Sequence, residues 1–348
     1  MNPLFIIAAT LSCFIASVTW ADEAATASAP VSLQAPAEGV AMLPRGLITP
    51  TVEPLVKNGW DIVVDVDFIW WKSHVSNFNF AVVNNRPMSP ASPFEPGLKL
   101  GTGMGMVHDG WDLYFQYTWL SQPETSKSAK AKIPSFSTQA FPFLDPLHPE
   151  TLSVMILSSA ESTRKFTFNV LDSDIGRNFF ISKRLTLRPF FGFKLASMFE
   201  KTTLSYEGVE SVRSAQSQLR QNLNGVGIRG GINTVWHIVR TFGFYGDLAL
   251  TTLWSDFHNR FINDVTTNAL TDSYTIKNTT LDVIPVIEAG LGATYMVWFS
   301  NERYLLTLKA GWEEQIWLNY NRNILSSTGS SSGSLTLQGL TFKVGFAF

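Results

Sequence analysis

The segment Trp60-Asp-Ile-Val-Val-Asp-Val-Asp-Phe-Ile-Trp70 decides the fold. All of its even-numbered residues are apolar, whereas its odd-numbered positions include Asp61, Asp65 and Asp67. Successive side chains of a β-strand point to opposite faces, so the segment predicts a strand with one apolar face and one acidic face. Carboxylates facing lipid would be very costly, so the acidic face is expected to face water.

The same period of two recurs up to the last residue of the chain. Further strands are expected near 98–106, 111–119, 165–181, 185–195, 226–236, 242–254, 281–297, 304–312 and 342–348. Short turns at 108–110, 182–184, 238–241 and 299–303 alternate with long polar segments at 73–96, 121–164, 199–219, 256–277 and 320–334. This alternation is typical of transmembrane barrels, with short periplasmic turns and long extracellular loops. The sequence therefore predicts an all-β, antiparallel, up-and-down transmembrane barrel of about ten strands, within a range of roughly eight to twelve.

Composition narrows the function classes. Charged residues make up 16% of the 348 residues, against about 25% in ordinary soluble domains. The net charge of −2 offers no basic face for a nucleic acid. Cys13 is the only cysteine, which excludes a disulfide framework and cysteine-bound metal clusters.

The N-terminal region is expected to direct export. Residues 4–18 are uncharged and apolar, and Thr19-Trp20-Ala21 places small residues at a cleavage site, so residues 1–21 predict a secretory signal peptide. Lipidation at Cys13 is an alternative, although few residues precede it. Residues 22–58 form an Ala/Pro-rich periplasmic lead-in, and residues 59–348 form the barrel. These segments predict a protein of the outer membrane of a Gram-negative-type bacterium.

Aromatic residues gather at the expected strand ends. Tryptophan prefers the boundary between lipid and water, because its ring is apolar and its N–H needs a polar partner. A soluble β-protein would place tryptophans mid-strand as readily. The last strand ends in an aromatic residue, which resembles the signal read by the barrel-assembly machinery. The expected girdle comprises Trp60, Trp70, Trp111, Trp119, Trp236, Trp254, Trp298, Trp312 and Phe348.

The inward face carries the residues that bear on function. Its charges predict a porin-like pore for the passive diffusion of ions and small solutes. Alternatively, the charges pair and plug the lumen, because narrow barrels leave room only for side chains. The protein would then anchor the envelope or adhere through its loops. The expected pore-lining residues are Asp61, Asp65, Asp67, Lys99, Asp112, Arg188, Lys194, Arg229, Asp247, Asp282, Glu288, Lys309, Glu313 and Lys343.

Catalysis receives little support from the sequence. The five histidines do not have metal-ligand spacing, and no cofactor or metal is expected. Glycines in 225–231 alternate within a strand, whereas phosphate binding needs a strand-to-helix turn. An outer-membrane protease with His74, Asp256 and His258 at its rim is a remote alternative. The expected partners are outer-membrane lipid, the assembly machinery, small solutes or ions, and other copies of the chain.

Short motifs also recur in a fixed order from residue 60 to residue 348. They are Asp67–Lys72, His108–Tyr114, Asn169–Asp172, Ile175–Asn178, Leu185–Pro189, Gly225–Gly230, Gly246–Leu250, Gly311–Glu314 and Leu335–Thr341. This ordered set resembles the Legionella- and chlamydia-type pore-forming major outer membrane protein family. The resemblance implies an outer-membrane barrel that conducts small solutes. The chlamydial members are cysteine-rich, so the resemblance does not extend to a disulfide-linked scaffold.

Overall fold

A computed structural model describes residues 61–83, 86–105, 110–130, 138–139, 157–182, 184–208, 212–267, 271–326 and 329–348. The expected signal peptide at 1–21 and the lead-in at 22–58 lie outside the described residues, as does Trp60. No helix long and apolar enough to cross a membrane occurs in the described part of the chain.

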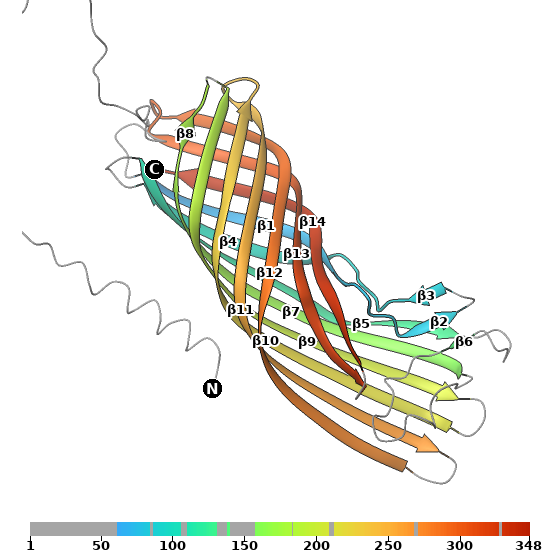
Figure 1. Cartoon of the computed structure of the whole chain (residues 1–348). Coiled ribbons are helices and arrows are strands. Elements are labelled where there is room, and N and C mark those ends of the chain that lie inside the picture. The colour runs from blue at the N-terminus through green and yellow to red at the C-terminus, as the bar shows by residue number, and fades with distance from the viewer. Residues whose placement is uncertain are drawn as a thin grey trace, which may run out of the picture. The chain divides into compact units, whose positions relative to one another are not determined.

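Ten long strands of the described residues close an antiparallel barrel, which confirms the predicted fold class (Figure 1). Each strand pairs with its neighbours in the order β1, β4, β5, β7, β9, β10, β11, β12, β13 and β14, and β14 pairs with β1. The strands are β1 (Ile62–Val75), β4 (Glu95–Gly105), β5 (Trp111–Lys130), β7 (Leu157–Arg177), β9 (Leu185–Gly208), β10 (Val212–His237), β11 (Phe242–Thr267), β12 (Thr271–Phe299), β13 (Tyr304–Ser326) and β14 (Gly329–Ala347).

Four short strands complete the described elements. β8 (Phe179–Phe180) pairs with the start of β9. β2 (Ala81–Val83), β3 (Arg86–Met88) and β6 (Thr138–Gln139) form a separate small sheet at the end of the barrel opposite the C-terminus (Figure 1). Through the pairing of β2 with β6, this sheet joins a segment between β1 and β4 to a segment between β5 and β7.

The last residue of the chain closes the barrel. The backbone N–H of Phe348 donates to the carbonyl of Ile62 at 3.0 Å, and the N–H of Ile62 donates to the carbonyl of Phe348 at 3.1 Å. From there β14 runs in continuous register along β1, from Val63 opposite Ala347 to Val75 opposite Leu335. A closed sheet has no free edge. A membrane sheet needs this closure because unpaired backbone groups are costly in lipid.

The acidic strand that begins the barrel shows the predicted alternation. Even-numbered side chains from Val64 to Trp70 are 44–50% exposed, whereas odd-numbered side chains from Asp65 to Trp71 are at most 3% exposed. The apolar face therefore points outward to lipid and the other face points into the lumen.

Three of the expected extracellular loops are strands instead. β9, β10, β11, β12, β13 and β14 continue through the described residues of 199–219, 256–277 and 320–334. The period of two persists there, but its polarity is reversed. Apolar side chains such as Leu204, Leu219 and Phe257 are buried inside, while polar side chains face outward. Water, not lipid, surrounds this part of the barrel, so the apolar face turns inward.

Candidate functional site in the barrel lumen

The lumen contains a cavity in its periplasmic half, which we call the inner cavity. Its volume is about 660 Å³, and it is lined by side chains of all ten barrel strands. The lining reaches Asp61, Gly110 and Ala347 at the periplasmic strand ends. The inner cavity therefore extends from the periplasmic mouth into the barrel.

Most of the expected pore-lining residues line this cavity. They are Asp61, Asp65, Asp67, Lys99, Asp112, Arg188, Arg229, Asp247, Glu288, Lys309, Glu313 and Lys343. The residues that do not line it are Lys194, which is fully buried, and Asp282, which accepts a hydrogen bond from the N–H of Val283 at 2.7 Å. Alternation predicts which face of a strand a side chain lies on, but not how far along the barrel axis it lies. Lys194 and Asp282 lie beyond the cavity along this axis.

Further lining residues escaped the sequence analysis. Asp172 and Asp174 line the cavity from β7, together with Tyr114, Asn233 and Tyr245 from other strands. The two aspartates alternate with Ser173 and so follow the period of two, but a polar residue on the lipid side weakened the pattern. The polar uncharged residues gave no signal of their own.

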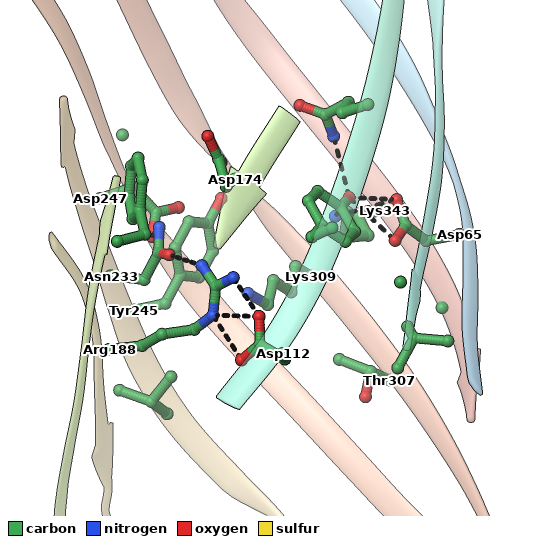
Figure 2. Close-up of a pocket in the computed structure, with 18 of the residues that line it drawn as sticks. Asp65, Asp112, Asp174, Arg188, Asn233, Tyr245, Asp247, Thr307, Lys309 and Lys343 are labelled. Atoms are coloured by element: carbon green, nitrogen blue, oxygen red, sulfur yellow. Dashed lines mark hydrogen bonds and ion pairs between the residues drawn. The ribbon is translucent and has the colours of Figure 1, made fainter. Parts of the chain in front are cut away.

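One wall of the inner cavity is a network around Arg188 (Figure 2). Arg188 Nε donates to both carboxylate oxygens of Asp112, at 3.0 and 2.9 Å, and its NH2 group pairs with the same carboxylate. Its NH1 group donates to Asn233 Oδ1 at 2.9 Å, and Asn233 Nδ2 donates to Asp247 Oδ1 at 2.7 Å. The guanidinium is thus held by β5 and β10 together.

The facing wall is a network around Lys343. Lys343 Nζ lies 2.9 Å from Asp65 Oδ1 and 3.8 Å from Asp67 Oδ1. It also donates to the hydroxyl of Tyr114 at 3.0 Å, and that hydroxyl donates to Asp65 at 2.9 Å. Asp65 and Asp67 of β1 therefore share one lysine from the last strand as an ion-pair partner.

A third network lies deeper in the barrel. Arg229 NH1 donates to Asp174 Oδ2 at 2.5 Å, and its NH2 group donates to Glu288 Oε2 at 3.2 Å. Lys194 Nζ bridges Glu288 and Asp172, at 2.9 and 2.7 Å. Burial of charge is tolerated only when charges pair, and this network satisfies that condition.

Two buried tryptophans lie on the extracellular side of the inner cavity; we call them the tryptophan layer. Trp71 and Trp317 are fully buried, and both point into the lumen. Lys99 Nζ lies 4.7 Å from the centre of the Trp71 ring, and Lys194 Nζ lies 5.9 Å from that of Trp317. The indole N–H of Trp71 donates to Thr341 Oγ1 at 3.2 Å. Each tryptophan ring of the layer therefore has a lysine ammonium beside it.

Apolar side chains continue beyond the tryptophan layer and form what we call the outer core. Phe168 meets Trp317 edge-on at 5.7 Å, and buried side chains of β9, β10, β11 and β14 extend the cluster. The cluster also includes Phe78 and Phe80, which belong to the connection between β1 and β4. The hydroxyl of Tyr206 donates to the carbonyl of Phe80 at 2.9 Å. The outer half of the lumen is filled with protein.

The expected aromatic girdle divides into outward and inward members. Outward-facing and 38–54% exposed are Trp70, Trp111, Trp119, Trp236, Trp254, Trp312 and Phe348. Trp298 differs, because it packs inside the periplasmic mouth against Leu305 and Ala347. The Arg240 guanidinium lies 5.4 Å from the centre of its ring. Trp298 follows Val297 on β12 and so falls on the opposite face from the lipid-exposed Tyr295 and Phe299.

The rim residues weighed for catalysis do not meet at the cavity. His258 Nδ1 lies 3.5 Å from Asp256 Oδ2, but both side chains are on the outward face of β11 and well exposed. His74 lies on β1, and the sheet order places β12, β13 and β14 between β1 and β11. Among the described residues, no cluster of His, Cys, Asp or Glu has the geometry of a metal site.

The comparisons with known proteins give one family match. The sequence model of a family described as Legionella pneumophila major outer membrane protein precursor matches residues 52–348. No curated protein matches the chain.

Solved barrels resemble the chain only distantly. The outer membrane protease OmpT of Escherichia coli is 10% identical, with a TM-score of 0.39 over 84% of this chain and 98% of that one. A major outer membrane protein of Thermus thermophilus is 8% identical, with a TM-score of 0.32 over 82% and 99%. A FadL homologue of Pseudomonas aeruginosa is 7% identical, with a TM-score of 0.25 over 83% and 90%. We draw no functional conclusion from likenesses this distant.

Proposed function

We propose that this chain, which belongs to the Legionella pneumophila major outer membrane protein family, forms an outer-membrane pore for ions and small solutes. The observation that carries the proposal is the inner cavity, a space of about 660 Å³ lined by charged side chains from every barrel strand. A barrel whose only task was anchoring would have no need of a charged cavity of this size.

The charge of the lining supports a preference for cations. Acidic side chains outnumber basic ones among the residues that line the inner cavity. A narrow cavity with low-dielectric walls focuses the field of such charges and raises the local concentration of the opposite ion. Cations are therefore expected to enter from the periplasmic mouth more readily than anions.

The outer core favours a second candidate function. Trp71, Trp317 and the apolar side chains beyond them occupy the path between the inner cavity and the extracellular side. Conduction requires that these side chains move aside. If they do not, the barrel acts as an envelope anchor or adhesin through the strands and connections outside the membrane.

We propose no catalytic role for the barrel, since the Asp256–His258 pair lies on its outward face. The outward apolar side chains suit contact with membrane lipid. Phe348, which ends the chain beside Phe346 at 6.0 Å, is the proposed contact for the assembly machinery. Association between copies of the chain would use the lipid-exposed face.

The deciding experiment is the conductance of the refolded, heat-modifiable protein in planar bilayers of known lipid. Discrete conductance steps in potassium chloride are expected. Protein that folds correctly and leaves the membrane silent would overturn the pore and favour the anchoring role.

The acidic face of β1 gives a sharper test. Asp61, Asp65 and Asp67 all line the cavity, and replacing all three by Asn should lower the preference for cations over anions. The effect should be largest at low salt, where screening is weak. Reversal potentials across a salt gradient measure it. Because Asp65 and Asp67 hold Lys343, the Asp61→Asn variant alone is the control that leaves this ion pair intact.

A further inference from the structure

Six cations that line or adjoin the inner cavity each lie beside an aromatic ring. The distances from the cation to the ring centre are 4.7 Å for Lys99 at Trp71, 5.7 Å for Arg188 and 4.8 Å for Arg229 at Phe190, 5.9 Å for Lys194 at Trp317, 4.9 Å for Lys309 at Tyr245 and 5.3 Å for Lys343 at Tyr114. Five of these cations also hold a carboxylate within 4 Å. Lys309 is the exception among these six described residues.

Lys309 is placed by a glycine pair. Gly292 and Gly311 lie opposite each other on β12 and β13, and the Tyr245 ring rests on them. A Cβ at Gly311 would collide with the Tyr245 hydroxyl, and one at Gly292 would lie 2.6 Å from its ring. Any larger residue would displace Tyr245, which is the platform for the Lys309 ammonium.

Asp247 is the acidic counterpart. It lies two residues from Tyr245 on the same inward face of β11, and it lines the same cavity as Lys309. It accepts a hydrogen bond from Asn233 Nδ2 at 2.7 Å. In the part of the chain that the structure describes, it has no cation within 4 Å, Lys309 included. Figure 2 shows both side chains in the same part of the cavity as Tyr245 and Arg188.

Buried or half-buried charges are normally paired, because leaving water costs free energy that a partner must offset. The wall formed by these described residues therefore offers a positive group, Lys309, and a negative group, Asp247, that form no ion pair with each other. A simple anion would be repelled by the excess of acidic side chains in the lining. A simple cation would be repelled by Lys309 and Arg188. A molecule with both charges matches both groups.

We propose that Lys309 and Asp247 bind a small zwitterion of the amino-acid type, with its carboxylate at Lys309 Nζ and its ammonium at the Asp247 carboxylate. The proposal rests on the proposed pore, for which it names a solute class. The Tyr245 ring lies beside the Lys309 ammonium, and Asn233, which accepts a hydrogen bond from Arg188, donates one to Asp247.

Isothermal titration of the refolded full chain in detergent tests the site, with glycine, acetate and methylammonium as probes. Glycine should bind at least tenfold more tightly than either single-charge probe. Lys309→Gln and Asp247→Asn should each weaken glycine binding at least tenfold, whereas Lys309→Arg should retain it. Thr307→Val, on the same face of β13 and the same cavity, is the uncharged control and should leave binding unchanged. Folding of each variant is checked by heat modifiability.

Glycine that binds no better than acetate, or that binds equally well to the Gln and Asn variants, would overturn the site. Bilayer conductance of the same preparations separates this from failure of the pore. Channels that conduct potassium chloride but do not bind glycine would support the proposed pore and refute the proposed glycine site. Glycine binding by a barrel that does not conduct in bilayers would support the proposed site and refute the proposed pore.

Discussion

The periplasmic and extracellular halves of the lumen are built from the same strands but in opposite ways. In the periplasmic half, charged side chains face inward around the inner cavity, and apolar side chains face lipid. In the extracellular half, apolar side chains face inward as the outer core, and polar side chains face water. The period of two is the same in both halves, and the apolar face is the one that meets lipid in the periplasmic half and the interior in the extracellular half.

Removal of the boundary between the halves should have the largest effect. Trp317→Ala deletes a fully buried ring that contacts Phe168 and Lys194, so it should lower the free energy of unfolding by about 3–5 kcal/mol. It should also raise conductance, because it opens the tryptophan layer. Trp312→Ala, five residues earlier on β13 but 42% exposed to lipid, is the matched control. Urea unfolding and bilayer recording measure both; equal effects of the two variants would refute the boundary.

A charge placed on either face of β13 should distinguish lipid from cavity. Leu308 is 39% exposed on the outward face, and Leu308→Arg should cost about 2–4 kcal/mol near the bilayer midplane. Thr307 lines the inner cavity, where water and carboxylates accommodate a cation, so Thr307→Arg should cost much less. Urea midpoints of vesicle-refolded protein compare the pair. Similar costs would show that the two faces of β13 are assigned wrongly.

The smallest expected effect is a pH dependence that begins in the extracellular half. His74 lies on β1 beyond Trp70, outside the membrane-spanning part. Partial burial lowers the pKa of its imidazole below the ordinary value of 6.5, and the neighbouring charges of Arg164 and Lys72 lower it further. The unfolded chain therefore binds a proton more readily than the folded one, and stability falls as the pH drops below about 6.5.

The His74→Gln variant should flatten this loss of stability in urea unfolding measured between pH 8 and pH 5. A slope identical to that of the unmodified protein would exclude a role for His74.

The reversed polarity of the extracellular half explains why its strands are not predicted from the sequence. The sequence predicts loops near residues 204, 219 and 257, because a membrane strand is recognised by apolar residues that face lipid. The same residues keep the period of two with the polarity reversed. Trp298 and Trp312 show the same limit, since a tryptophan at a strand end can face either lipid or the mouth of the barrel.

The sequence by itself determined the family, the positions of the membrane-spanning parts of the strands, their number to within about two, and the lipid-facing side of most of them. A period of two is a local property, and it follows from chain geometry alone. Only the tertiary structure decided which charges meet, such as Arg188 with Asp112 and Lys343 with Asp65, and where the lumen is filled. These depend on the stagger between strands far apart in the chain and on the height of each residue along the barrel axis, which the periodicity does not encode.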